Sequence, residues 1–273
     1  MVILSLLMYF ATHFSQKDVV FFQSKELKSL ELNRQEKKFV ILDDEGQEIQ
    51  ILEYRDNTGL IYWYRRVLTP VCLTGECKLI DIGIYWDCTG DFFALEVYGE
   101  HLTKTDHSNF TTENYQFLID VLKNDWSLLR EYELTNLVDE QEVDLVDGIS
   151  GATKMEIALE TVKDAVYTTY TIWHLVHLGE KEQIINLTTS CLNEKILSIQ
   201  SLIVNEDEKY RHFILSLLSD QKLTSTPVLD SLVLVGLTAQ SAKFKKLAYD
   251  ALSKIDINEQ ILDSDLFGCI YSG

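Results

Sequence analysis

The residues with the clearest potential for chemistry are the seven from 147 to 153, Asp-Gly-Ile-Ser-Gly-Ala-Thr, directly before a stretch with helical periodicity. The Gly-Ala pair lets the backbone come close to a ligand. The start of a helix offers unpaired N–H groups and the positive end of the helix dipole, and both stabilise a phosphate. Thr153 adds a hydroxyl that can form a phosphoester. The segment therefore predicts a phosphate site.

The segment resembles the D-x-x-[ST]-G-A-[ST] motif of the FMN-binding domain family, which includes the covalently flavinylated subunits of the sodium-pumping NADH:quinone reductase and the Rnf complex. In that family, a Mg²⁺-dependent flavin transferase joins the final Thr or Ser to the phosphate of FMN. The resemblance implies that Thr153 carries FMN. It also implies a cofactor-binding turn made by the preceding residues Asp147, Gly148, Ser150, Gly151 and Ala152. Many family members have a hydroxyl residue where this chain has Met155.

A second interpretation of Thr153 needs no cofactor. Thr153 and Glu156 have the T-x-x-E spacing of a capping box, in which each side chain bonds the other residue's backbone N–H. A capping box explains these two residues and leaves the rest of the motif unexplained.

The polar loop from 102 to 111 offers further candidate cofactor contacts. Lys104 or His107 near the N1–C2 carbonyl of a flavin would stabilise the reduced anion. The alternative is a solvated loop that leads into a Thr-capped helix.

Two of the five cysteines are spaced for a disulfide. If Thr74 and Gly75 form a two-residue hairpin loop, Cys72 and Cys77 face each other in a closely spaced pair. We therefore predict a disulfide in an exported protein, and no metal site, because no second Cys/His pair accompanies them. The remaining thiols are expected to be buried: Cys88, Cys191 and Cys269.

The elements that must position these residues indicate an α+β fold with an antiparallel sheet. Alternation and turn residues predict strands at 39–42, 49–52, 60–64, 78–85 and 91–98. Helices are predicted at 24–32, at 111–123 and, as one long amphipathic helix packed across the sheet, at 153–176. Trp173, His174 and His177 near its end are interpreted as core packing and a polar helix end, rather than as haem or quinone contacts.

Beyond Gly179 the pattern predicts helices only, at 182–192, 195–204, 208–218, 227–237 and 241–254. Their spacing is similar to that of HEAT-type helical repeats, and a small helical bundle is the alternative. We therefore divide the chain into a candidate signal peptide (1–16), an α+β FMN-binding-like domain (17–178, with the resemblance covering 60–178) and a helical domain (179–273).

Composition and the N-terminal run bear on partners and location. The net charge of −19 disfavours nucleic acid as a partner. The sequence has no run of eighteen apolar residues, so no transmembrane helix is predicted. The run from Val2 to Ala11 has the length of a signal-peptide h-region, although no Lys or Arg precedes Lys17, and a buried N-terminal element is the alternative.

Taken together, the sequence predicts an extracytoplasmic flavoprotein that carries FMN on a threonine and relays electrons, rather than an enzyme that converts a substrate. A flavin transferase for maturation and a redox protein are the partners expected from the resemblance. No residue is assigned a catalytic or metal-binding role. The alternative function is an exported protein-interaction module with a helical-repeat surface.

Overall fold

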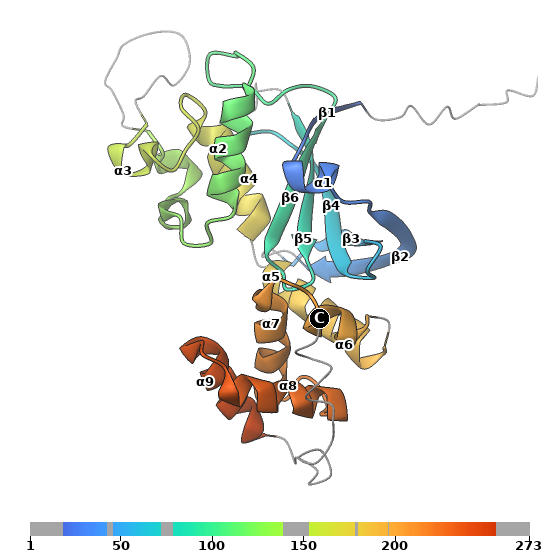
Figure 1. Cartoon of the computed structure of the whole chain (residues 1–273). Helices are drawn as coiled ribbons and strands as arrows, with labels where there is room; N and C mark the ends of the chain where they lie inside the picture. Colours follow the sequence, from blue (N-terminus) through green and yellow to red (C-terminus); the bar gives the residue numbers. More distant parts are fainter. Residues whose placement is uncertain are drawn as a thin grey trace, which may run out of the picture.

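The structure, a computed structural model, describes residues 19–42, 46–71, 79–138, 153–177, 180–195 and 197–254. Its described strands form one antiparallel sheet in the order β1-β6-β5-β4-β3-β2, beside which helices pack (Figure 1). The strands are β1 (Val20–Gln23), β2 (Asn33–Leu42), β3 (Glu48–Arg55), β4 (Ile61–Thr69), β5 (Ile80–Asp87) and β6 (Phe92–Tyr98). The α+β class and the antiparallel sheet are therefore confirmed.

The hairpins follow from alternating side chains and turn residues. In β3, Ile49 and Ile51 are buried while Gln50 between them is exposed, as expected for a strand with one face on a core. The pairing of β4 with β5 places Trp63 opposite Trp86, and both indoles are almost completely buried. These two side chains form the centre of the core on this face of the sheet.

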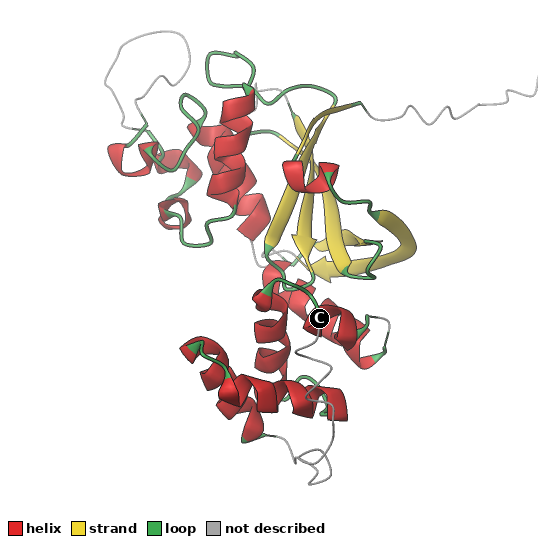
Figure 2. Cartoon of the chain, in the orientation of Figure 1, coloured by secondary structure: helices red, strands yellow, loops and turns green. Residues whose placement is uncertain are grey.

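Helices α2 (Thr112–Leu122) and α4 (Val166–His177) pack together beside this sheet (Figure 2). The predicted start of α2 is confirmed, because Thr111 and Asn114 form a reciprocal capping box. Two short 3₁₀ turns, Leu128–Glu131 and Leu134–Asn136, follow α2.

The prediction of one long helix over 153–176 is wrong. The chain forms a single turn, α3 (Met155–Ala158), and helix resumes only at α4. Between them Asp164 has a positive φ of 61°, and the buried N–H of Val162 donates to the Thr169 hydroxyl instead of to a helical carbonyl. The regular spacing of apolar residues in this segment therefore indicates which residues are buried. The chain buries them with a turn between two helices instead of one long helix.

The opposite face of the sheet carries tyrosines and a short helix. The predicted helix over 24–32 is reduced to α1 (Lys25–Lys28), and β1 precedes it at the sheet edge. The ring of Tyr64 lies close to Gly83, where an added Cβ atom would be 2.6 Å from a ring carbon. This close approach explains why a glycine stands in the middle of a central strand.

The described residues from 180 to 254 are helical, as predicted, with a shorter second helix than expected. Its helices are α5 (Glu180–Asn193), α6 (Ile199–Ile203), α7 (Glu208–Ser219), α8 (Pro227–Thr238) and α9 (Ala242–Leu252). The Trp63 indole N–H donates to the Thr188 hydroxyl of α5 over 2.9 Å. At the free edge of β2, the side-chain amide of Gln183 hydrogen-bonds both backbone groups of Leu42. Among the described helices, none combines the length and apolarity needed to cross a membrane.

Candidate functional site

Thr153, the predicted FMN acceptor, lies in a short extended segment outside any helix. Its backbone pairs with Val138, and the N–H of Lys154 donates to the carbonyl oxygen of Leu137 over 3.1 Å. The helix begins only at Met155, with Lys154 at its N-cap and no side-chain cap. The capping-box interpretation is therefore wrong. Thr153 is half-buried, and in the described parts of the chain its hydroxyl has no hydrogen-bond partner.

The surroundings of Thr153 agree only in part with a phosphate site. The one-turn helix α3 cannot supply the dipole of the long helix that the sequence suggested. Lys154 follows Thr153 in the chain, and its ammonium lies 5.5 Å from the ring centre of Tyr132. The residues Asp147, Gly148, Ser150, Gly151 and Ala152 of the motif lie outside the described residues. A half-buried threonine hydroxyl that caps no helix is compatible with attachment of a phosphate group.

The loop that carries Lys104 and His107 is folded on itself and anchored near α4. The N–H of His107 donates to the carbonyl oxygen of Lys104 over 3.0 Å. Both the N–H and the hydroxyl of Thr105 donate to the carbonyl oxygen of Asp164, in the connection between α3 and α4. His107 is exposed and Lys104 is half-buried, and no contact between either side chain and Thr153 is described. Their flavin-binding role stays a prediction.

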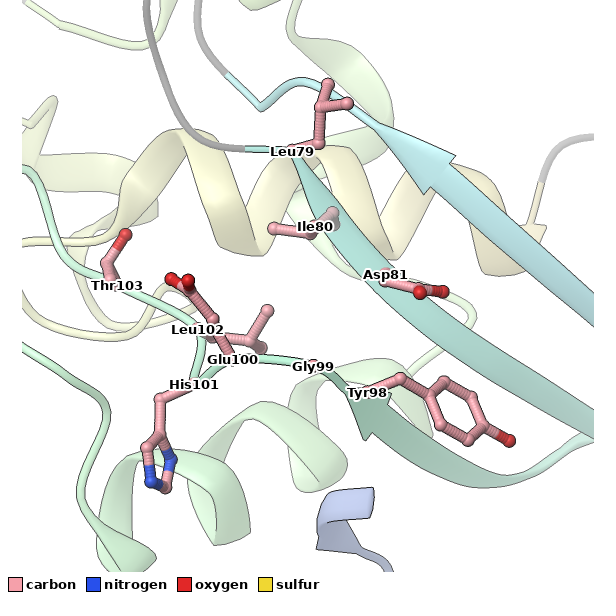
Figure 3. A pocket seen from close by; sticks show the side chains of 9 residues that line it. All are labelled: Leu79, Ile80, Asp81, Tyr98, Gly99, Glu100, His101, Leu102 and Thr103. Atoms are coloured by element: carbon pink, nitrogen blue, oxygen red, sulfur yellow. The ribbon is translucent and has the colours of Figure 1, made fainter. Parts of the chain in front are cut away.

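A hollow of about 410 Å³ opens beside this loop, between the start of β5 and the segment after β6 (Figure 3). The Glu100 carboxylate points into it, whereas His101 turns away toward α2. Asp81 lies on the β5 side and pairs with Arg66 over 2.7 Å. Because two carboxylates line this hollow, it is a poor site for a phosphate or an anionic flavin.

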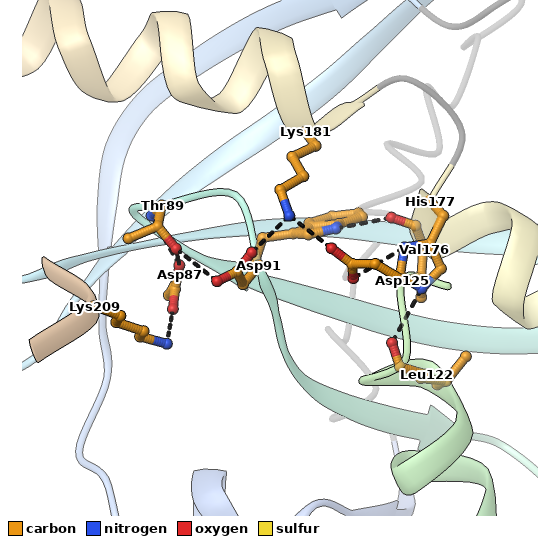
Figure 4. A network of polar contacts seen from close by, with 10 residues as sticks. Asp87, Thr89, Asp91, Leu122, Asp125, Val176, His177, Lys181 and Lys209 are labelled. Carbon is orange, nitrogen blue, oxygen red and sulfur yellow. Dashed lines mark hydrogen bonds and ion pairs between the residues drawn. The ribbon is translucent and has the colours of Figure 1, made fainter. Parts of the chain in front are cut away.

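A charged network that sequence reasoning missed joins the β5–β6 turn to the helices (Figure 4). The ammonium of Lys181 lies between Asp91 and Asp125, at 2.7 and 2.8 Å. The carboxylate of Asp87, 1% exposed, accepts from the Thr89 hydroxyl and from Lys209. The signal for this network is the polar turn at 87–91, but its partners are 90 residues or more away in the chain.

A second buried carboxylate lies on the tyrosine-bearing face of the sheet. Glu96 accepts hydrogen bonds from the hydroxyls of Tyr85 and Tyr98 and from the amide of Gln23. Burial, together with the neighbouring Glu96 carboxylate, raises the pKa of both tyrosines far above the usual range. These hydroxyls therefore stay protonated and act as donors to Glu96.

The cysteine predictions are tested in part. Cys88 and Cys191 are buried free thiols, as expected, and burial raises the pKa of Cys191 to about 11. The predicted pair Cys72 and Cys77, as well as Cys269, lie outside the described residues. Within the described ranges, no group of three His, Cys, Asp or Glu side chains is arranged to hold a metal ion.

Comparison with known proteins finds no relative of this chain. No family model, no curated protein and no solved structure matches the chain.

Proposed function

We propose that the protein is an extracytoplasmic flavoprotein that carries FMN through a phosphoester on Thr153 and relays electrons to or from a redox protein. The observation that carries the proposal is the state of Thr153. It completes the Asp147–Thr153 motif, yet its hydroxyl caps no helix and is bonded to no described residue. A helix-capping role therefore no longer competes for this side chain.

The chain's own residues have limited roles in this proposal. FMN, when attached, supplies one- and two-electron chemistry. Thr153 anchors the phosphate, and pairing of its backbone with Val138 holds the anchor in place. The Lys154 ammonium offsets the phosphate charge by Coulomb attraction. Lys104 and His107 stay candidates for contact with the flavin ring.

The decisive experiment is mass spectrometry of the peptide that spans Thr153, after coexpression with a flavin transferase of matching origin. We expect a mass increase that corresponds to FMN, its loss in Thr153→Ala, and its retention in Thr153→Ser. Lys154→Gln is expected to reduce the extent of loading. Thr189→Ala serves as a matched control, because Thr189 is a helical threonine whose hydroxyl bonds the carbonyl of Ile185 in its own helix.

An unmodified peptide from folded wild-type protein would falsify the assignment of Thr153. Loading that persists in Thr153→Ala would move the attachment point to another hydroxyl. In the first case, the alternative of an exported protein-interaction module becomes the better proposal.

A further inference from the structure

A second hollow, of about 520 Å³, lies where the segment after α2 meets the last turns of α4 and the first turn of α5. Its walls are aromatic and its rim is charged. The side chains that line it are Asp125, Trp126, Arg130, Trp173, His174, His177 and Lys181. Its volume is in the range of small-molecule sites.

Two indoles make the aromatic walls. Trp173 is 4% exposed, donates its N–H to the carbonyl of Asn124 over 3.1 Å, and packs against the ring of His177 at 4.3 Å. Trp126 is 80% exposed. An indole left so open beside a fixed one provides a stacking surface for a flat aromatic ring.

The histidines provide an acceptor. Nδ1 of His174 lies 3.0 Å from the carbonyl oxygen of Tyr170. Because a carbonyl oxygen only accepts, Nδ1 carries the proton, and Nε2 is left with a lone pair. Nε2 has no hydrogen-bond partner in the described parts of the chain. Burial lowers the pKa of His174, which keeps the ring neutral.

The two cations that line the hollow, Lys181 and Arg130, differ in how many of their N–H groups are already bound by carboxylates. Lys181 is held by two carboxylates, as described above. The guanidinium of Arg130 lies over the Trp126 ring at 5.0 Å, and its Nε is 3.2 Å from the carboxylate of Glu131. Its two terminal nitrogens have no partner among the described residues. A stacked arginine with free terminal nitrogens is suited to bind a carboxylate through two bonds.

We propose that this hollow binds a flat aromatic acid that also carries a hydroxyl or ring N–H. The ring stacks on Trp126, the carboxylate pairs with Arg130, and the hydroxyl donates to Nε2 of His174. The site is independent of the flavin proposal, because it needs neither Thr153 nor FMN.

The test is calorimetric titration of the unflavinylated full chain with 6-hydroxy-2-naphthoate, which has all three features. We expect saturable binding that weakens about tenfold or more in Arg130→Gln and in Trp126→Ala. His174→Phe should weaken binding of this probe and leave binding of 2-naphthoate, which lacks the hydroxyl, unchanged. 2-Naphthol, which lacks the carboxylate, should bind wild type and Arg130→Gln equally weakly.

Two controls exclude general effects of charge and aromatic surface. Arg34→Gln removes an exposed arginine on β2, and Tyr249→Ala removes an exposed aromatic ring on α9. Both should leave binding unchanged, and thermal unfolding confirms that each variant is folded. A wild-type dissociation constant weaker than about 1 mM overturns the proposal. So does binding that is insensitive to Arg130→Gln and Trp126→Ala.

Discussion

His174 and His177 show what burial does to single titratable residues. Burial lowers the pKa of both rings, because an imidazolium loses its hydration there, although Asp125 beside His177 acts in the opposite direction. Each ring donates to a backbone carbonyl, His174 to Tyr170 and His177 to Leu122, and these bonds also raise the pKa, but burial has the larger effect. The folded state therefore favours the neutral form of both histidines.

Stability should accordingly fall in mild acid. The folded pKa lies below the unfolded value of about 6.5, so the stabilising difference is fully present above that pH and is lost as the pH falls below it. We expect the melting temperature to drop between about pH 7.5 and 5.5. The double variant His174→Gln/His177→Asn should show a smaller drop, and His107→Gln, in an exposed loop, the full one. A melting temperature equal at both pH values contradicts this account.

Single residues could be predicted from the sequence where their own type or close neighbours determine their environment, and not where residues distant in sequence do. The buried thiols of Cys88 and Cys191 could be predicted from residue type alone. The lining of the aromatic hollow could not, because Trp126 and Arg130 come from one segment and Trp173 and His174 from another, and only the fold brings them together. Sequence patterns show that an aromatic residue is present, but not what it faces.

At the scale of elements, strands were easier to predict than the helix after Thr153. Alternation in β3 and the polar turns specify hairpins through contacts between residues near in sequence. Over 153–176 the apolar spacing is helical, yet Thr161 and Val162 are β-branched and the buried turn is held by side-chain bonds. Periodicity reports which residues are buried and does not distinguish a helix from a turn that buries the same residues.

The turn between α3 and α4 depends on the hydroxyl of Thr169. It accepts from the N–H of Val162 at 3.1 Å and donates to the carbonyl of Ala165 at 2.9 Å, and both Thr169 and Val162 are buried. Thr169→Val keeps the volume and removes both bonds. We expect a loss of about 1–3 kcal/mol in the free energy of unfolding, because the buried Val162 N–H is left unpaired.

The matched control for this variant is Thr169→Ser, which keeps the hydroxyl. Amide hydrogen exchange at Val162 separates the two: it should accelerate in Thr169→Val and stay slow in Thr169→Ser. Equal exchange in both variants would show that the hydroxyl does not hold the turn.

At the scale of the whole molecule, the helical part closes the core of the sheet. The Trp63 N–H reaches Thr188, and both side chains are fully buried. Lys209 of α7 pairs with the buried carboxylate of Asp87 in the sheet. The sequence separations exceed 100 residues, so no local pattern indicated these contacts, and the division at residue 178 was drawn without them.

These contacts predict that residues 1–179 alone do not form a stable domain. Truncation exposes Trp63 and removes the ammonium of Lys209 that pairs with Asp87, and loss of one partner of a buried ion pair is strongly destabilising. We expect the full chain to unfold in one transition. The truncated chain should have red-shifted tryptophan emission and no cooperative melting. A truncated chain with the emission and melting of a folded protein would show that the sheet part is independent.

The way in which β2 ends the sheet has a consequence for contacts between copies of the chain. An open strand edge is a template on which a strand of another molecule can add. Here Gln183 occupies both backbone groups of Leu42, and exposed Lys37 and Lys38 lie beside the register shift between Arg34 and Lys38. A second copy that approached this edge would have to displace the amide and bring like charges together, so the edge resists strand-by-strand aggregation even at high protein concentration.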